Sequence, residues 1–207
     1  AAPPRYTTAD AWIWARQKQL RHTVEYLFST HQYGEAGRQI YDFFWSEFAD
    51  WYLEIAKLQM AEGGDRAFYT ADALVSVLDT CLRLLHPFTP FVTEELWGRL
   101  KVAAQAASPQ IGLGDVDAAA QQEKGWPEAL ILAPWPKPLA EEGWESRALE
   151  NFSRLQEIIR AIRNLRAEKG LAHQKKLPAL INAGPYLEQI RADAWMIAAL
   201  AGLDPAR

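Results

Sequence analysis

The sequence predicts a mainly α-helical protein, in which an up-and-down helical bundle is followed by a small α/β unit with two short parallel strands. Three observations predict this architecture. Apolar residues recur every three or four positions through the first hundred residues, as in amphipathic helices. Two short apolar runs follow, and a long segment with helical periodicity lies between them. We therefore expect a bundle over residues 1–101, a flexible insertion over 102–127, and an α/β unit over 128–207 that docks on the bundle.

Four helices are expected in the bundle, and their short connections favour antiparallel packing. They cover residues 10–30, 35–60, 70–85 and 90–101. Thr7 or Thr8 is the first plausible N-cap of the first helix. On that helix, Arg16, Lys18 and Arg21 lie on faces other than the apolar one.

The second helix is rich in aromatic residues. Its apolar spacing predicts an inner face of Ile40, Phe44, Phe48, Trp51, Ile55 and Leu58. Tyr41, Trp45 and Tyr52 form an adjacent stripe. An aromatic face of this width predicts contacts on two sides of the helix.

Residues 84–97, with the sequence LLHPFTPFVTEELW, join the third helix to the fourth. Pro87 has no amide hydrogen and clashes with the preceding turn, so the third helix must end or kink there. Pro90 suits the first position of the next helix, with Thr89 as its N-cap. We therefore expect a helix, a turn and a second helix.

The second half of the chain predicts a strand, a helix, a second strand and a closing helix. These elements cover residues 129–133, 144–169, 177–181 and 186–200. Gly170 is expected to end the long helix. A strand, a helix and a strand in this order imply a right-handed crossover and parallel pairing. Residues 102–125 are rich in Ala, Gln, Gly and Ser without a sustained period, as expected for a surface insertion.

Composition limits the class of protein. No run of about 18 apolar residues is present, so no membrane span is expected. The single cysteine, Cys81, falls in the apolar phase of a helix and has no partner for an internal disulfide. This usage suits a reducing compartment, and we expect a cytoplasmic location.

The sequence contains no pattern typical of a catalytic or metal site. His22, His31, His86 and His173 have no metal-ligand spacing, and no glycine-rich phosphate loop is present. We expect no catalytic residue, no metal site and no cofactor in this chain.

A basic segment stands out in a chain whose formal net charge is −4. Against two glutamates it has seven basic residues, namely Arg154, Arg160, Arg163, Arg166, Lys169, Lys175 and Lys176. Arg160, Arg163 and Arg166 step by three and so drift across about 120° of the helix surface. We expect this stripe opposite Ile158, Ile162 and Leu165. Compensation of the helix dipole explains such a cluster as well as contacts with phosphates do, and both interpretations stay open.

Four segments carry a resemblance to a known family. They are residues 41–54 (YDFFWSEFADWYLE), residues 86–97, residues 133–136 (APWP) and residues 162–168 (IRNLRAE). Together, and in this order, they closely resemble the C-terminal anticodon-binding domain of valyl-tRNA synthetases. Isoleucyl- and leucyl-tRNA synthetases share the bundle and a related His-Pro-Phe turn, but the aromatic helix and residues 164–166 favour the valyl family.

The resemblance implies a class I ligase that joins valine to tRNA(Val) with ATP and Mg. This chain has neither the His-Ile-Gly-His nor the Lys-Met-Ser-Lys-Ser type of signature, so the catalytic and editing domains are expected upstream of it. We therefore expect a non-catalytic, tRNA-binding part whose partners are tRNA(Val) and the catalytic domain of the same chain.

The candidate tRNA contacts are cationic residues together with one aromatic residue. They are Arg160, Arg163, Arg166, Lys169, Lys175 and Lys176, with Trp97 and Arg99 as further candidates. The main rival hypothesis is a helical module that binds protein partners, which predicts an exposed aromatic patch and no basic groove. A second rival hypothesis is a stand-alone enzyme, but the sequence lacks the catalytic patterns that it would need.

Overall fold

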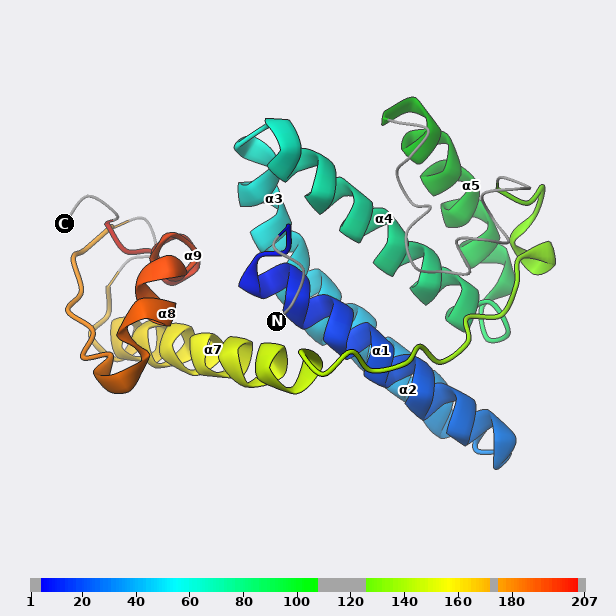
Figure 1. Ribbon diagram of the computed structural model, residues 1–207, viewed down its shortest axis with the longest axis horizontal. Helices are drawn as coiled ribbons and strands as arrows, with labels where there is room; N and C mark the ends of the chain where they lie inside the picture. The colour runs from blue at the N-terminus through cyan, green and yellow to red at the C-terminus, as the bar shows by residue number, and fades with distance from the viewer. Residues whose placement is uncertain (1–4, 108–125, 172–174, 205–207) are drawn as a thin grey trace. The chain divides into compact units, whose positions relative to one another are not determined.

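The computed structural model describes residues 5–107, 126–171 and 175–204 (Figure 1). The chain divides into two compact units, Ala1–Gly143 and Trp144–Arg207, which are described separately. Both are built mainly from helices, as the sequence predicts.

The first unit is a helical bundle. Its elements are α1 (Thr8–Ser29), α2 (Tyr33–Asp42), the π-helix η1 (Phe43–Tyr52), α3 (Leu53–Ala61), α4 (Gly64–Leu85) and α5 (Pro90–Ala107). α2, η1 and α3 follow one another without a break, so they form the single long helix that the sequence predicts. This helix packs on α1 and α4, and α5 packs on α4 (Figure 1). α5 reaches Ala107, so residues 102–107 are helical; the rest of the predicted insertion, residues 108–125, lies outside the described residues.

A capping box starts α1 and confirms Thr7 as the N-cap. The amide of Asp10 donates to the Thr7 hydroxyl (3.1 Å), and the Thr7 amide donates to the Asp10 carboxylate (2.9 Å). The same buried carboxylate accepts hydrogen bonds from Tyr52 on η1 and Arg66 on α4, each at 2.8 Å. One acidic side chain therefore caps the N-terminus of α1 and also ties three helices together.

The π-helix changes which aromatic residues enter the core. Phe43 and Tyr52 are buried, whereas the sequence places Phe44 in the core and Tyr52 in the neighbouring stripe. Phe43 and the next buried aromatic residue, Phe48, are five positions apart, which is the hydrogen-bond spacing of a π-helix. The wider turn moves the core face by part of a turn, so a prediction based on α-helical spacing misassigns these residues.

Two cations of α1 that were expected on its outer faces are buried. Arg21 donates to the Thr80 hydroxyl at 2.9 Å, and Lys18 forms an ion pair with Glu142 at 2.7 Å. The chain after the 3-10 turn η2 (Leu130–Leu132) runs along this side of α1, where His22 contacts the carbonyl of Leu139 at 2.8 Å (Figure 1). A later segment therefore covers a face that looks solvent-exposed in the helix alone.

The junction between α4 and α5 has the predicted form, since α4 ends at Leu85 and α5 begins at Pro90. An aromatic cluster holds it in place: the ring centroid of Phe28 on α1 lies 6.1 Å from that of Phe88 and 5.0 Å from that of Trp135. A Cβ atom at Gly37 would lie 3.2 Å from the Phe88 ring, so the glycine leaves the space that Phe88 occupies. The cluster thereby joins two of the four family-like segments.

The two predicted strands are wrong, and the described residues contain no strand. Residues 129–133 instead include the single 3-10 turn η2 (Leu130–Leu132), in which only Leu130 is buried. The Leu130 amide donates to the Glu94 carboxylate at 2.8 Å rather than to a neighbouring strand. Residues 177–181 contribute one isolated parallel bridge, between Leu177 and Leu203. The two runs belong to different units, so the predicted crossover does not form.

The second unit is also helical. It consists of α7 (Glu145–Glu168), η3 (Gly184–Tyr186), α8 (Leu187–Ala192) and α9 (Ala194–Ala201), with α7 packed against α9. Gly170, at φ +61°, ends α7 as the sequence predicts, and the Leu171 amide donates to the carbonyl of Arg166. The closing helix is divided at Asp193, which separates α8 from α9.

Candidate nucleic-acid interface

The predicted basic segment lies on the last turns of α7 and on the chain that follows it. Arg160 and Arg163 are exposed on α7, and Lys169, Lys175 and Lys176 are exposed after it. No ion pair joins any of these three lysines to another residue within the described ranges. Such exposed cations suit electrostatic contacts with a phosphate backbone.

Arg166 differs from the other cations because its side chain is buried, with 9% of its surface exposed. The core side of α7 carries Phe152, Leu155 and Ile159, all fully buried. At about 100° per residue, Arg166 falls within about 20° of Ile159 around the helix axis. Leu165, which the sequence assigns to the inner face, is 55% exposed. Arg160 and Arg163 therefore lie on the exposed side of α7, but Arg166 lies on its core side. The predicted position of all three opposite the core is wrong.

Both Arg163 and Arg166 donate to main-chain carbonyls near the end of α9. The Arg163 Nε donates to Leu200 at 2.9 Å, and Arg166 donates to Gly202 at 3.1 Å. A second nitrogen of Arg166 donates to the carbonyl of Lys175 at 2.8 Å. Cations at the C-terminus of a helix are favoured by its dipole, so the dipole interpretation explains part of this cluster.

The structure places Trp97 in the core of the first unit, packed with Leu82 and Leu130. Its side chain is 1% exposed, and its indole N–H donates to the Asp79 carboxylate at 2.6 Å. The same carboxylate pairs with buried Arg83 at 2.8 Å. Burial raises the pKa of Asp79, while Arg83 and the Trp97 indole act in the opposite direction. The ring has no accessible face on which a base could stack.

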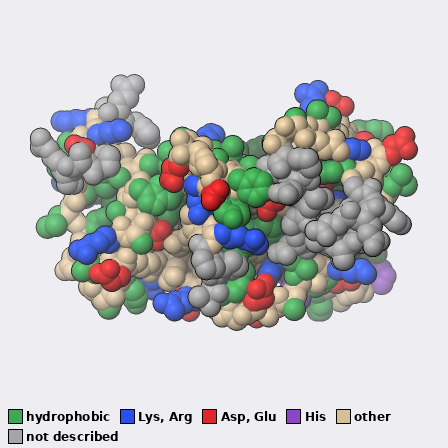
Figure 2. All heavy atoms as spheres, turned by 45° about the horizontal axis from the view of Figure 1, so that its top comes forward, with side chains coloured by type: hydrophobic (Ala, Val, Ile, Leu, Met, Phe, Trp, Pro, Cys, Tyr) green, Lys and Arg blue, Asp and Glu red, His purple; other side chains and the backbone are tan. Residues whose placement is uncertain are grey.

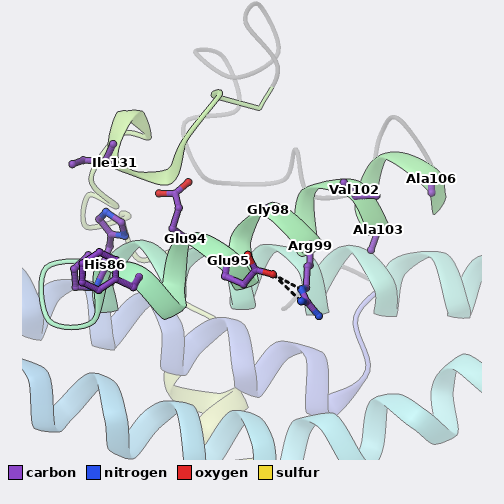
Figure 3. A pocket seen from close by; sticks show the side chains of 11 residues that line it. His86, Glu94, Glu95, Gly98, Arg99, Val102, Ala103, Ala106 and Ile131 are labelled. Atoms are coloured by element: carbon purple, nitrogen blue, oxygen red, sulfur yellow. Dashed lines mark hydrogen bonds and ion pairs between the residues drawn. The ribbon is translucent and has the colours of Figure 1, made fainter.

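Arg99 lies on the opposite side of α5 and pairs with Glu95 at 2.7 Å (Figure 3). This exposed side of the helix borders an open groove of about 810 Å³. Phe91, which is 91% exposed, and Val102 line it from α5, and Ile131 lines it from η2. We call the exposed surface formed by Phe91, Glu95, Arg99, Val102 and Ile131 the α5 face. Exposed apolar side chains that gather in this way make the α5 face a candidate interaction surface.

The sequence analysis did not predict the α5 face, although the spacing of apolar residues on α5 contains a signal for it. Core residues of α5 such as Trp97 and Ala104 recur on one side, while Phe91 and Val102 recur about 140° away. A helix that is apolar on both sides is normally covered on both. Figure 2 shows Lys and Arg side chains of the described residues interspersed with acidic and hydrophobic ones on the face drawn.

The described residues show no group of His, Cys, Asp and Glu that could hold a metal ion. Within the same ranges, no helix is both long and apolar enough to span a membrane.

Comparison with known proteins places this geometry in a family. The family model for the anticodon-binding domain of tRNA ligases matches residues 10–181. The chain belongs to this family. The matched region runs from the first turn of α1 to the segment after α7, so it includes the π-helix, the α4–α5 junction and the whole basic segment.

Curated relatives of this anticodon-binding domain are valine–tRNA ligases. The proteins from Carboxydothermus hydrogenoformans and Symbiobacterium thermophilum are 38% and 37% identical over 96% and 86% of the chain. The protein from Geobacillus kaustophilus is 37% identical over 90% of it. The chain covers 20%, 19% and 18% of these three relatives, respectively, so it spans about a fifth of their length.

Proposed function

We propose that this chain is the tRNA-binding domain of a valine–tRNA ligase, and that it holds the anticodon arm of tRNA(Val). The observation that carries this proposal is the identity of 37–38% to valine–tRNA ligases, together with the family match over residues 10–181. The parent enzyme joins valine to tRNA(Val) with ATP and Mg in catalytic and editing domains outside this chain. A cytoplasmic location is part of the same proposal.

In this mechanism the chain binds and orients tRNA and performs no chemistry itself. Arg160, Arg163, Lys169, Lys175 and Lys176 contact phosphates, which gives affinity that is independent of sequence and sensitive to salt. Holding the anticodon arm fixes the distance and direction of the acceptor end, which must reach the catalytic site. Binding energy gained far from the reacting atoms is thereby used for orientation.

Charging assays on the full-length enzyme test the proposal. We expect valine to be attached to a tRNA(Val) transcript, and not isoleucine or leucine to their tRNAs. Substituting the exposed cations with alanine should raise the KM for tRNA(Val) and leave the KM for valine unchanged. Charging of tRNA(Ile) or tRNA(Leu) instead would assign the chain to one of the two related ligases.

A contact with protein is a second candidate function, and the α5 face favours it. The lining of its groove is mostly apolar, and Arg99 already pairs with Glu95, so the α5 face offers little to a phosphate. We infer that another part of the same ligase covers it, since the relatives are about five times as long.

Unfolding experiments with Phe91→Glu test this contact. Phe91 is almost fully exposed here, so the substitution should be nearly neutral in the isolated chain, within about 0.5 kcal/mol. In the full-length enzyme it should lower the midpoint of thermal unfolding. Tyr26→Glu, at another exposed aromatic residue, is the matched control. Equal effects of Phe91→Glu in both proteins would contradict a covered α5 face.

A further inference from the structure

Arg166 lies within the basic segment, but its side chain is buried and its guanidinium is turned inward. It lies in the core phase of α7, and two of its nitrogens donate to main-chain carbonyls from different segments. One acceptor is Gly202, the C-cap of α9, and the other is Lys175. The fixed, planar fork of arginine can bridge two carbonyls in this way, whereas the single ammonium group of lysine is a point donor.

Main-chain bonds to the residues after α9 hold the segment that follows Lys175. The amide of Asp204 donates to the carbonyl of Leu177 at 3.0 Å, next to the isolated bridge between Leu177 and Leu203. No strand holds this segment in the described part of the unit, and the bridge and the Arg166 bond are two contacts that fix the backbone on either side of Lys176. The direction in which Lys175 and Lys176 project therefore depends on Arg166.

We propose that Arg166 is a positioning residue for tRNA binding, which acts through Lys175 and Lys176 and does not touch a phosphate itself. The inference rests on the proposed function. A direct contact would turn the guanidinium away from the two carbonyls, and both part-buried hydrogen bonds would then be lost. Kept inward, the arginine also stabilises the C-terminus of α9 through the helix dipole.

Arg163 provides the matched comparison on the same helix. It lies three residues before Arg166 and also donates to a carbonyl at the end of α9, but its side chain is exposed. If it contacts a phosphate directly, its removal should act independently of the two lysines. Removal of Arg166 should instead reproduce the loss of the two lysines.

The experiment measures the Kd of the full-length ligase for tRNA(Val) as a function of salt concentration. The single variants are Arg166→Ala and Arg163→Ala. The lysine pair is the double variant Lys175→Ala with Lys176→Ala, and each arginine substitution is also combined with it. We expect the two lysine substitutions to lower the slope of log Kd against log salt concentration by about 1 to 2, as for the loss of one or two phosphate contacts. Arg166→Ala should weaken binding by about the same factor as the two lysine substitutions. Adding Arg166→Ala to the lysine pair should change Kd by less than about twofold, whereas adding Arg163→Ala should multiply the loss.

Arg166→Lys separates the positioning role from a simple charge effect, and it also decides the matter if Arg166→Ala does not fold. A phosphate contact would survive in this variant because the charge remains, but a bridge between two carbonyls would not. We expect binding close to that of the lysine-pair variant. Wild-type binding by Arg166→Lys, or a loss from Arg166→Ala that multiplies with the lysine pair, would overturn the inference. An unchanged Kd in the lysine pair would also overturn it, while normal charging of tRNA(Val) would leave the proposed function standing.

Discussion

Replacing Asp79 with alanine removes the shared acceptor of two buried donors. Its carboxylate accepts from the Arg83 guanidinium at 2.8 Å and from the Trp97 indole at 2.6 Å, and all three side chains are at least 96% buried. Arg83 also donates to the carbonyl of Pro134 at 3.2 Å, so the network ties α4, α5 and the segment after η2 together.

The expected loss is large because Arg83 would keep its charge without its partner. Breaking a buried ion pair from one side costs about 3–5 kcal/mol. The indole N–H would also lose its acceptor, which costs about 1–3 kcal/mol by itself. These terms overlap, and the bond from Arg83 to Pro134 remains, so we expect about 3–5 kcal/mol in total.

Urea unfolding followed by circular dichroism at the helical band measures this loss. Glu95→Ala, which removes the exposed pair with Arg99, is the control and should cost at most about 1 kcal/mol. Combining Asp79→Ala with Arg83→Met removes the stranded charge and should recover part of the stability. A cost below about 1 kcal/mol for Asp79→Ala, or a double variant less stable than the single one, would refute this reasoning.

Three further predictions follow from local geometry. Gly37→Leu should destabilise the chain by about 1–3 kcal/mol in urea unfolding, since even a Cβ would lie 3.2 Å from the Phe88 ring; a neutral result would mean that Phe88 moves freely. Burial raises the pKa of both Tyr52 and Cys81, so each favours the folded state in its protonated form, and this contribution is lost as pH rises. The free energy of unfolding should therefore fall as pH rises above about 8.5, the usual pKa of a thiol. It should fall less steeply with pH in Cys81→Ala, and a free energy that stays constant up to about pH 11 would contradict this. A hydrogen bond from a neighbouring arginine, followed by one from a glutamine, lowers the pKa of Glu35. An NMR titration should therefore find its midpoint below the usual glutamate value of about 4.3, and a midpoint at or above that value would contradict this.

The residues that identify the family act mainly in the fold. Phe88 and Trp135 meet on Phe28, and Tyr52 completes the network around Asp10. Trp97 closes the core next to Asp79. These contacts lie within the first unit and fix how its helices pack, so the likeness to the family reports the scaffold more directly than it reports the tRNA contacts.

The sequence by itself determined the features that depend on neighbouring residues along the chain. Four such features form as predicted: the N-cap at Thr7, the end of α4 before Pro87, the start of α5 at Pro90 and the glycine end of α7. Each rests on dihedral angles and hydrogen bonds within one or two turns, which the local residue types fix. The helical class and the family followed from the same local patterns.

Only the tertiary structure decided which residues are covered by distant parts of the chain. Residues 129–133 and 177–181 have the composition of strands, but a strand needs a partner, and neither run finds the ladder that the composition predicts. Arg21 and Arg166 are buried because carbonyl or hydroxyl acceptors from remote segments reach them, which no helical period encodes. Exposure of the cations could likewise not be read from spacing alone, since burial of a polar side chain depends on acceptors that folding brings to it.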